Sequence, residues 1–232
     1  MTTNQQEYRQ PRFAPPPGAT EVLLVRHGES RAATPDNPFP LVDGHGDPEL
    51  HANGRAQAEL VAHRLYNEPL AAIYVSNLRR TGETAAPLCR QLGLEPRIDP
   101  DLREVCLGDW EGGLFRIKAH EGDPVYLRMQ AEERWDVIPN GESNDALSAR
   151  LSAALARIRQ AHPDARVAAF VHGGVIANIL HMATGSRPFA FTGAANGSIS
   201  HIVLLEDRIM VRSFNDCAHL AETIVPGDSQ LT

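Results

Sequence analysis

The sequence predicts an α/β fold, a three-layer α/β/α sandwich with a mostly parallel central sheet. Three short apolar runs have the composition of strands buried on both faces: 22–25, 71–75 and 167–171. Each run is followed along the chain by a segment with helical apolar spacing. Alternating strands and helices are typical of a parallel sheet covered by helices on both sides. At 232 residues the chain is long enough to bury one such core.

The first part of the chain contains two segments without a clear periodic pattern. Residues 1–20 are polar and proline-rich, which predicts a disordered tail ahead of a single domain at 21–232. Residues 31–53 are rich in Pro, Asp and Gly and predict a loop. A loop of this length is usually functional, so we expect a rim or lid over a site. Asn53 is a suitable N-cap for a helix over 54–66. We expect that helix to face the core through Ala56, Leu60, Val61 and Leu65.

The later elements complete the sandwich. We expect the remaining helices and strands at 79–92, 97–98, 143–162, 175–183, 199–205 and 209–214. Gly93 closes the helix that contains Pro87, and Ser143 is a suitable N-cap for the long helix that follows it. Residues 112–140 do not fit the alternation and predict a small insertion at the carboxyl edge of the sheet.

Composition excludes several classes of function. A formal net charge of −7 disfavours binding to nucleic acid or to an anionic membrane surface. Three widely separated cysteines predict free thiols in a reducing compartment, not disulfides or a zinc site. The N-terminus lacks the pattern of a signal peptide, and no apolar run is long enough to span a bilayer. We therefore expect a cytoplasmic protein. A homodimer is compatible with the sequence, which does not fix the oligomeric state.

Cationic or imidazole side chains follow each of the three buried strands: Arg26 and His27, then Arg79 and Arg80, then His172. The carboxyl ends of parallel strands meet at one edge of a sheet, where α/β proteins bind ligands. Gly28 permits a tight turn and a close approach of the backbone to a ligand. Arginines, imidazoles and helix N-termini together suit a phosphoryl group.

These motifs resemble those of the histidine phosphatase superfamily, which includes phosphoglycerate mutases. Residues 24–30 resemble the family's signature. Residues 76–85 are similar to its second motif, an alignment that makes Arg80, not Arg79, the pocket arginine. Two further segments resemble those carrying the family's acid/base glutamate and second histidine, at Glu104 and His172.

The resemblance implies a phosphomonoester hydrolase that acts on a phosphorylated small molecule. His27 would attack phosphorus and form a phosphohistidine. Arg26, Arg80 and His172, with Gly28, would hold the phosphoryl group. Glu104 would protonate the leaving alkoxide and then deprotonate the attacking water. Because the arginines and His172 supply the charge, the resemblance implies no metal and no cofactor.

His45, Asp47 and His51 lie close together in the 31–53 loop and carry side chains of types that can bind a metal. The three residues lack regular ligand spacing. We therefore do not expect these three residues to form a metal site.

Two other functions remain as alternatives. A phosphoglycerate mutase is disfavoured because many family members carry asparagine six positions after the histidine, where this chain has Ala33. Mutases also often have asparagine where this chain has Gly174, and their larger insertion carries paired arginines. The short insertion here has only scattered cations: Arg116, Lys118, Arg128 and Arg134. A catalytically silent phospho-ligand-binding module would be expected to lack the nucleophile or the acid, yet both are present.

Overall fold

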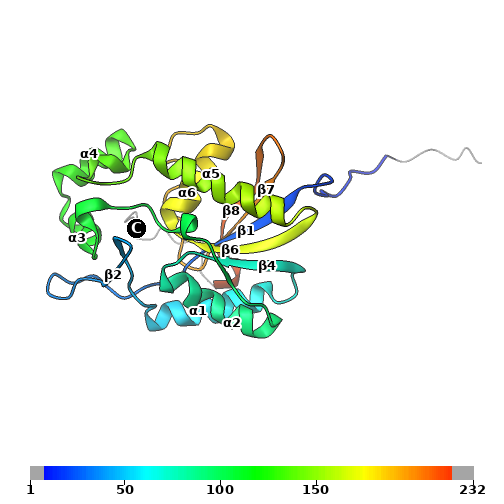
Figure 1. The fold of residues 1–232 in the computed structure, drawn as a ribbon, viewed down its shortest axis with the longest axis horizontal. Helices are drawn as coiled ribbons and strands as arrows, with labels where there is room; N and C mark the ends of the chain where they lie inside the picture. Colours follow the sequence, from blue (N-terminus) through cyan, green and yellow to red (C-terminus); the bar gives the residue numbers. More distant parts are fainter. Residues whose placement is uncertain (1–7, 221–232) are drawn as a thin grey trace, which may run out of the picture.

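The computed structural model describes residues 8–220, and Figure 1 shows a central sheet between layers of helices. Six strands lie in the order β5-β4-β6-β1-β7-β8. Their bounds are β1 Thr20–Arg26, β4 Leu70–Val75, β5 Arg97–Ile98, β6 Ala165–Val171, β7 Ile199–Leu204 and β8 Ile209–Asp216. Neighbouring strands from β5 to β1 pair in parallel, whereas β7 and β8 are antiparallel. The predicted mostly parallel sheet is confirmed.

Two helices cover each face of the sheet. The helices are α1 Ala52–Leu65, α2 Arg79–Leu92, α3 Leu114–Glu121, α4 Pro124–Glu132, α5 Asn144–Ala161 and α6 Gly173–Thr184. Short 3-10 turns occur at Pro100–Leu102, Gly108–Trp110, Trp135–Val137 and Ala218–Leu220. Alternate residues of β1 serve the two cores: Val22 and Leu24 pack towards α5 and α6, and Leu23 and Val25 towards α1 and α2. The α/β/α sandwich is therefore as predicted.

Helix α1 buries only part of the face that the sequence suggested: Val61 and Leu65 are in the core as expected, but Ala56 and Leu60 are not. Its N-cap is His51, which accepts a hydrogen bond from the Asn53 N–H, so Asn53 lies inside the helix. Ala56 and Leu60 are exposed, and the buried side is Gly54, Ala58, Val61, Ala62 and Leu65. Small residues mark this face because the helix touches the turn after β1. A Cβ on Gly54 would lie 2.0 Å from the Glu29 carbonyl oxygen.

The predicted loop at 31–53 contains a small hairpin. Strands β2 (Leu41–Val42) and β3 (His45–Gly46) pair antiparallel. Asp43 and Gly44 between them have φ values of 47° and 79°, the positive values that a tight hairpin turn requires. The predicted loop therefore contains a short two-stranded hairpin that its Asp-Gly turn makes possible.

The insertion forms its own small core beside the carboxyl ends of the strands. Helices α3 and α4 lie together at one end of the molecule (Figure 1). Their buried contacts come from Trp110, Phe115, Met129, Val137, Ile138 and Phe189. Aromatic rings dominate this cluster, which stiffens a segment that lacks support from the sheet.

The chain ahead of β1 forms no helix or strand over residues 8–19. The guanidinium of Arg212 lies 3.7 Å from the centroid of the Phe13 ring. Thr20 begins β1 and its hydroxyl donates to the His162 carbonyl at 2.8 Å. The rest of the predicted tail, residues 1–7, lies outside the described residues. No helix within residues 8–220 combines the length and apolar character that crossing a membrane requires.

Candidate active site

A pocket of about 110 Å³ lies at the carboxyl ends of the parallel strands. The structure brings Arg26, His27, Arg80 and Glu104 together in its wall. His172 lies directly behind, with its ring centroid 5.2 Å from that of His27. Five side chains that are far apart in the sequence therefore meet at one site.

His27 follows β1 and is held in a fixed orientation. It is 4% exposed, and its backbone N–H donates to the Val171 carbonyl at 3.0 Å. Its ring Nδ1 lies 2.7 Å from the Gly28 carbonyl oxygen, which only accepts hydrogen bonds. Nδ1 therefore carries the proton, and Nε2 carries the lone pair. Burial, with the positive charges of Arg80 and Arg26, holds the pKa of His27 well below its usual value. A neutral ring of this kind is a potential nucleophile.

His172 caps α6 and is completely buried. Its Nε2 lies 2.9 Å from the Ser76 hydroxyl, and its Nδ1 has no hydrogen-bond partner among the described residues. Burial lowers the pKa of His172 well below the usual value, and Arg80 and His27 lower it further. An unpartnered nitrogen beside an anion pocket is suited to contact a ligand oxygen.

Arg26 and Arg80 are the two buried guanidinium groups that the strand ends supply. Burial lowers the pKa of each to about 10, so both remain charged at neutral pH. Arg26 donates to the Ala194 carbonyl, and Arg80 donates to the Gly46 carbonyl at 2.8 Å. These contacts fix each group through one of its donors and leave others for a ligand.

Arg79 points away from the pocket. Its side chain is 44% exposed and pairs with Asp47 and Glu49. Asp47 also accepts a hydrogen bond from the Arg79 backbone N–H at 2.8 Å, at the first turn of α2. Asp47 therefore caps α2, whereas His51 caps α1. Among the described residues, the ligand atoms that lie within 4.8 Å of one another around His45 come from Cys106 and Glu111, not from Asp47 or His51.

Arg116 is a third pocket arginine that sequence reasoning did not select. It extends from α3 and donates to the Ser30 hydroxyl at 2.8 Å and to the Arg31 carbonyl at 2.9 Å. Burial lowers its pKa. Arg116 and Arg26 also line an adjoining cavity of about 520 Å³, which Ala33 borders. The insertion thus brings a cation next to Ala33.

Glu104 lies against the N-terminus of α6. Its two carboxylate oxygens accept hydrogen bonds from the Val105 N–H at 3.0 Å and from the Gly174 N–H at 3.3 Å. A Cβ on Gly174 would lie 2.7 Å from Glu104 Oε1. The absence of a side chain at residue 174 therefore allows the carboxylate to reach this place.

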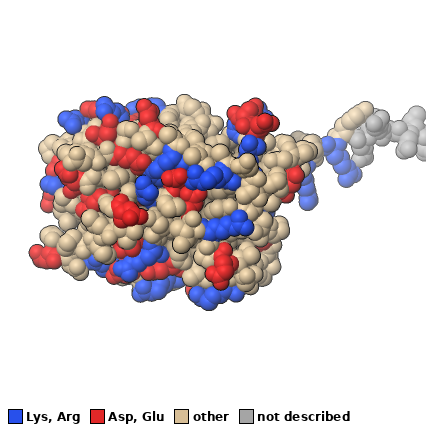
Figure 2. All heavy atoms as spheres, viewed as in Figure 1, with Lys and Arg blue, Asp and Glu red and all other residues tan. Residues whose placement is uncertain are grey.

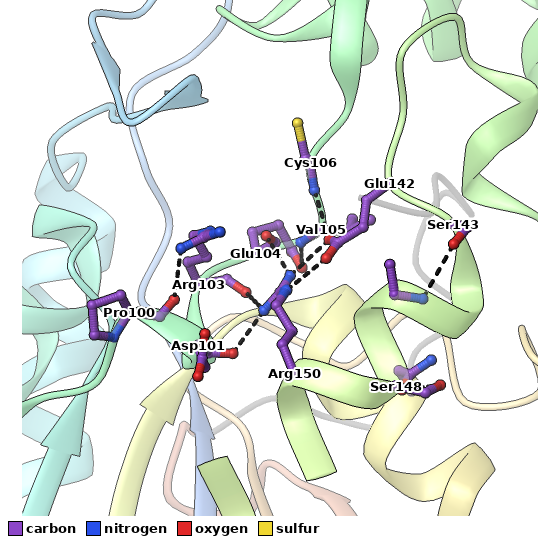
Figure 3. A network of polar contacts seen from close by, with 12 residues as sticks. Pro100, Asp101, Arg103, Glu104, Val105, Cys106, Glu142, Ser143, Ser148 and Arg150 are labelled. Carbon is purple, nitrogen blue, oxygen red and sulfur yellow. Dashed lines mark hydrogen bonds and ion pairs between the residues drawn. The ribbon is translucent and has the colours of Figure 1, made fainter. Parts of the chain in front are cut away.

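Arg150 holds the loop that carries Glu104, as Figure 3 shows. Its guanidinium donates to the carbonyls of Asp101, Arg103 and Glu104 at 2.7, 2.8 and 2.9 Å. The same group pairs with both carboxylate oxygens of Glu142, at 2.7 and 2.8 Å. No sequence pattern marks Arg150 for this role, because three of its acceptors are backbone carbonyls.

Gly28 contributes to the site through packing. Its N–H donates to the Thr84 hydroxyl at 3.0 Å, so this group is already engaged. A Cβ on Gly28 would lie 2.4 Å from the backbone oxygen of Gly54. Glycine is therefore required for the contact between the turn after β1 and helix α1.

Positive charge is concentrated inside the pocket. On the face drawn in Figure 2, acidic and basic side chains are interspersed. Inside the pocket, by contrast, burial lowers the pKa of Arg26 and Arg80, and nearby positive charges lower it further: Arg116 and Arg80 act on Arg26, and Arg116 acts on Arg80. Glu104 is the largest opposing charge on both. Such a site favours a dianionic ligand.

The comparisons with known proteins agree with this geometry. The family model described as histidine phosphatase superfamily (branch 1) matches residues 22–217. Phosphoglycerate mutase-like protein 4 of Arabidopsis thaliana is 37% identical over 210 residues, which is 88% of each chain. Phosphoserine phosphatase 1 of Hydrogenobacter thermophilus is 31% identical over 209 residues, covering 88% of this chain and 96% of that one.

A solved structure of a mycobacterial glucosyl-3-phosphoglycerate phosphatase has a TM-score of 0.71 and 26% identity, covering 85% of this chain and 99% of that one. Relatives are thus named both as phosphatases and as mutase-like proteins, and phosphoryl-transfer chemistry fits the pocket described above. The chain belongs to branch 1 of the histidine phosphatase superfamily.

Proposed function

We propose that the protein is a metal-independent phosphomonoester hydrolase that works through a phosphohistidine on His27. One observation carries the proposal. The His27 ring is kept neutral, its Nδ1 donates to the Gly28 carbonyl, and Nε2 remains in a pocket that contains buried guanidinium groups. A neutral imidazole is the form that attacks phosphorus.

The reaction has two balanced steps. In the first, the Nε2 lone pair of His27 forms a bond to phosphorus while the bond to the leaving oxygen breaks. The Glu104 carboxyl group gives its proton to that oxygen, so the alcohol leaves neutral. In the second, water attacks the phosphohistidine, Glu104 takes the water proton, and His27 leaves as a neutral imidazole. Inorganic phosphate is the other product.

The phosphoryl oxygens would be held by Arg26, Arg80 and Nδ1 of His172. We further propose that Arg116 takes the place of the asparagine found in many relatives, because it reaches the pocket beside Ala33. Hydrogen bonds to charged groups are worth about 1.5–3 kcal/mol, so Arg116→Gln should weaken inhibition by inorganic phosphate about 10–100-fold. The matched control is Arg128→Gln, whose side chain is 59% exposed on α4 and should leave inhibition unchanged.

Hydrolysis is favoured over mutase activity by the surroundings of Glu104. An asparagine side chain at residue 174 would occupy the space that the Glu104 carboxylate takes in this chain. Apolar groups of Phe39, Phe115 and Trp135 line the same pocket, which supports a small phosphomonoester whose leaving group has an apolar or planar part.

The test combines a labelling experiment with product analysis. A radiolabelled phosphomonoester should label the protein in an acid-labile form, and His27→Ala should abolish both labelling and turnover. The control is His63→Ala, an exposed histidine on α1. Phosphorus NMR on 3-phosphoglycerate should show free phosphate appearing ahead of 2-phosphoglycerate. Labelling of the His27→Ala variant, or the reverse order of products, would contradict the proposal.

A further inference from the structure

We propose that His45, Cys106 and Glu111 form a binding site for Zn²⁺ at the rim of the phosphate pocket. One ligand atom from each residue lies within 4.8 Å of the other two. The three residues come from strand β3, from the segment after Glu104 and from the end of a 3-10 turn. None of them has a role in the proposed hydrolysis, so the inference goes beyond that function.

His45 supplies the observation that points to a ligand. Its side chain is buried, at 5% exposed, and its Nδ1 lies 3.0 Å from the Asp43 carbonyl oxygen. Because a carbonyl only accepts, Nδ1 carries the proton and Nε2 carries the lone pair. Nε2 is buried and has no hydrogen-bond partner among the described residues. A neutral imidazole whose other nitrogen donates to a carbonyl is the usual form of a histidine metal ligand.

The Glu111 carboxylate is fixed in the manner of a metal ligand. One oxygen accepts from the Leu107 N–H at 2.8 Å, and the other accepts from the Gly46 N–H at 2.7 Å. Each oxygen keeps a second lone pair. Gly46 directly follows His45, so one of these hydrogen bonds also ties the carboxylate to the strand that carries the imidazole.

Cys106 provides the soft ligand. Figure 3 shows its sulfur pointing away from the Arg150 network, while its backbone N–H donates to Glu142 at 3.1 Å. A thiolate, an imidazole and a carboxylate form a donor set that suits Zn²⁺ and disfavours Mg²⁺ or Ca²⁺. Zinc–ligand bonds of about 2.0–2.3 Å place tetrahedral ligand atoms roughly 3.3–3.7 Å apart. Side-chain rotations that move the ligand atoms by about 1 Å would therefore complete the site.

Three protein ligands leave a fourth position open on zinc. His45 and Glu111 line the same pocket as His27 and Arg26, so this position faces the phosphate site. A zinc ion there would hold a phosphate oxygen away from His27. We therefore expect bound Zn²⁺ to inhibit phosphomonoester hydrolysis, and removal of the metal by a chelator to restore it.

The test measures zinc binding directly, without substrate. The full chain is titrated with Zn²⁺ in competition with a chromophoric zinc indicator, and Co²⁺ is used as a spectroscopic substitute. We expect one zinc ion per chain and a thiolate-to-cobalt charge-transfer band. Cys106→Ser should weaken zinc binding at least about tenfold and abolish the band, and His45→Gln should weaken binding similarly. The control is Cys217→Ser, a cysteine of comparable half-burial, which should bind like the wild type.

Activity provides a second measurement. Cys106→Ser should keep its basal hydrolysis and tolerate a roughly tenfold higher zinc concentration, whereas Cys217→Ser should be inhibited like the wild type. Unchanged zinc affinity in either Cys106→Ser or His45→Gln, or a cobalt band that survives in Cys106→Ser, would overturn the site. Because binding is measured without catalysis, failure here leaves the hydrolase proposal standing. A failed hydrolase test likewise leaves the zinc titration valid.

Discussion

Replacing Arg150 with methionine should destabilise the loop that carries Glu104 more than the rest of the fold. The guanidinium donates to three backbone carbonyls in this loop and pairs with Glu142. Methionine retains an unbranched apolar side chain but none of the donors. The loop would then keep two hydrogen bonds between Cys106 and Glu142: the Cys106 N–H donates to the Glu142 carboxylate, and the Glu142 N–H donates to the Cys106 carbonyl.

The burial of this ion pair sets the expected loss of stability. The side chains of Arg150 and Glu142 are only 11% and 14% exposed. Removing one partner of a buried pair costs about 3–5 kcal/mol. We expect the lower end, about 3 kcal/mol, because Glu142 is partly exposed and keeps the Cys106 N–H as a donor. For a domain of this size the loss corresponds to a fall in Tm of roughly 6–12 °C.

The effect on activity should depend on the leaving group. If Glu104 is the general acid, a displaced loop slows the departure of an alcohol that needs a proton, and this catalysis is worth roughly 10²–10⁴-fold. The assay is kcat and KM for an alkyl phosphate and for p-nitrophenyl phosphate, together with thermal unfolding. We expect kcat to fall about tenfold or more further on the alkyl phosphate.

Arg157 on the same helix provides the matched control. Its side chain is 50% exposed and pairs with Asp99 and Asp101, so Arg157→Met should cost at most about 1 kcal/mol and leave the ratio of the two substrates unchanged. Equal losses of kcat on both substrates in Arg150→Met would refute the reasoning. Arg150 would then stabilise the fold without positioning the acid.

Three further predictions concern the acid and the two histidines. Glu104→Gln should lower kcat about 10²–10⁴-fold on an alkyl phosphate and much less on p-nitrophenyl phosphate, and equal losses would indicate a binding role instead. Gly174→Ala should lower kcat with little change in Tm, because the new methyl group displaces only the end of the Glu104 side chain; full activity would disprove the steric argument. The folded-state pKa values of His27 and His172 lie below 6.5, so the unfolded chain binds protons more readily. The free energy of unfolding should therefore fall as pH drops from about 7.5 to about 5.5, and His172→Gln should reduce that slope. The unfolding free energy is measured by denaturant titration at each pH. If its dependence on pH is the same in His172→Gln as in the wild type, His172 does not contribute to it.

The sequence was most informative where side chains follow buried strands. A strand buried on both faces has no freedom of register, so the residues after β1 and β6 must emerge at the same edge of the sheet. Arg26, His27 and His172 therefore lie where the pattern placed them. Arg80 needed the family alignment in addition, because Arg79 beside it has the same chemistry and differs only in the face of α2 that it occupies.

The remaining parts of the site depend on contacts that periodicity does not encode. Arg116 reaches the pocket only because the insertion folds onto an aromatic cluster, and in the sequence it was one cation among several. Arg150 acts through backbone carbonyls, which have no side-chain signature. The core face of α1 was assigned only in part, because Gly54 approaches the backbone of Glu29 closely, whereas the prediction included larger apolar residues such as Leu60. Close approach by small residues is visible only after the neighbouring turn is placed.

Under the proposed mechanism, the pocket arginines would connect phosphate binding with the protonation state of His27. Arg80 and Arg26 favour a phosphate dianion, and the same charges lower the pKa of His27 and keep its ring neutral. A neutral imidazole alone is not sufficient, because the negative charge of a phosphate dianion opposes attack unless nearby cations offset it. Removing either arginine therefore weakens phosphate binding and at the same time allows His27 to take up a proton more easily. The two effects act in the same direction, so the loss of catalysis should exceed the loss of binding alone.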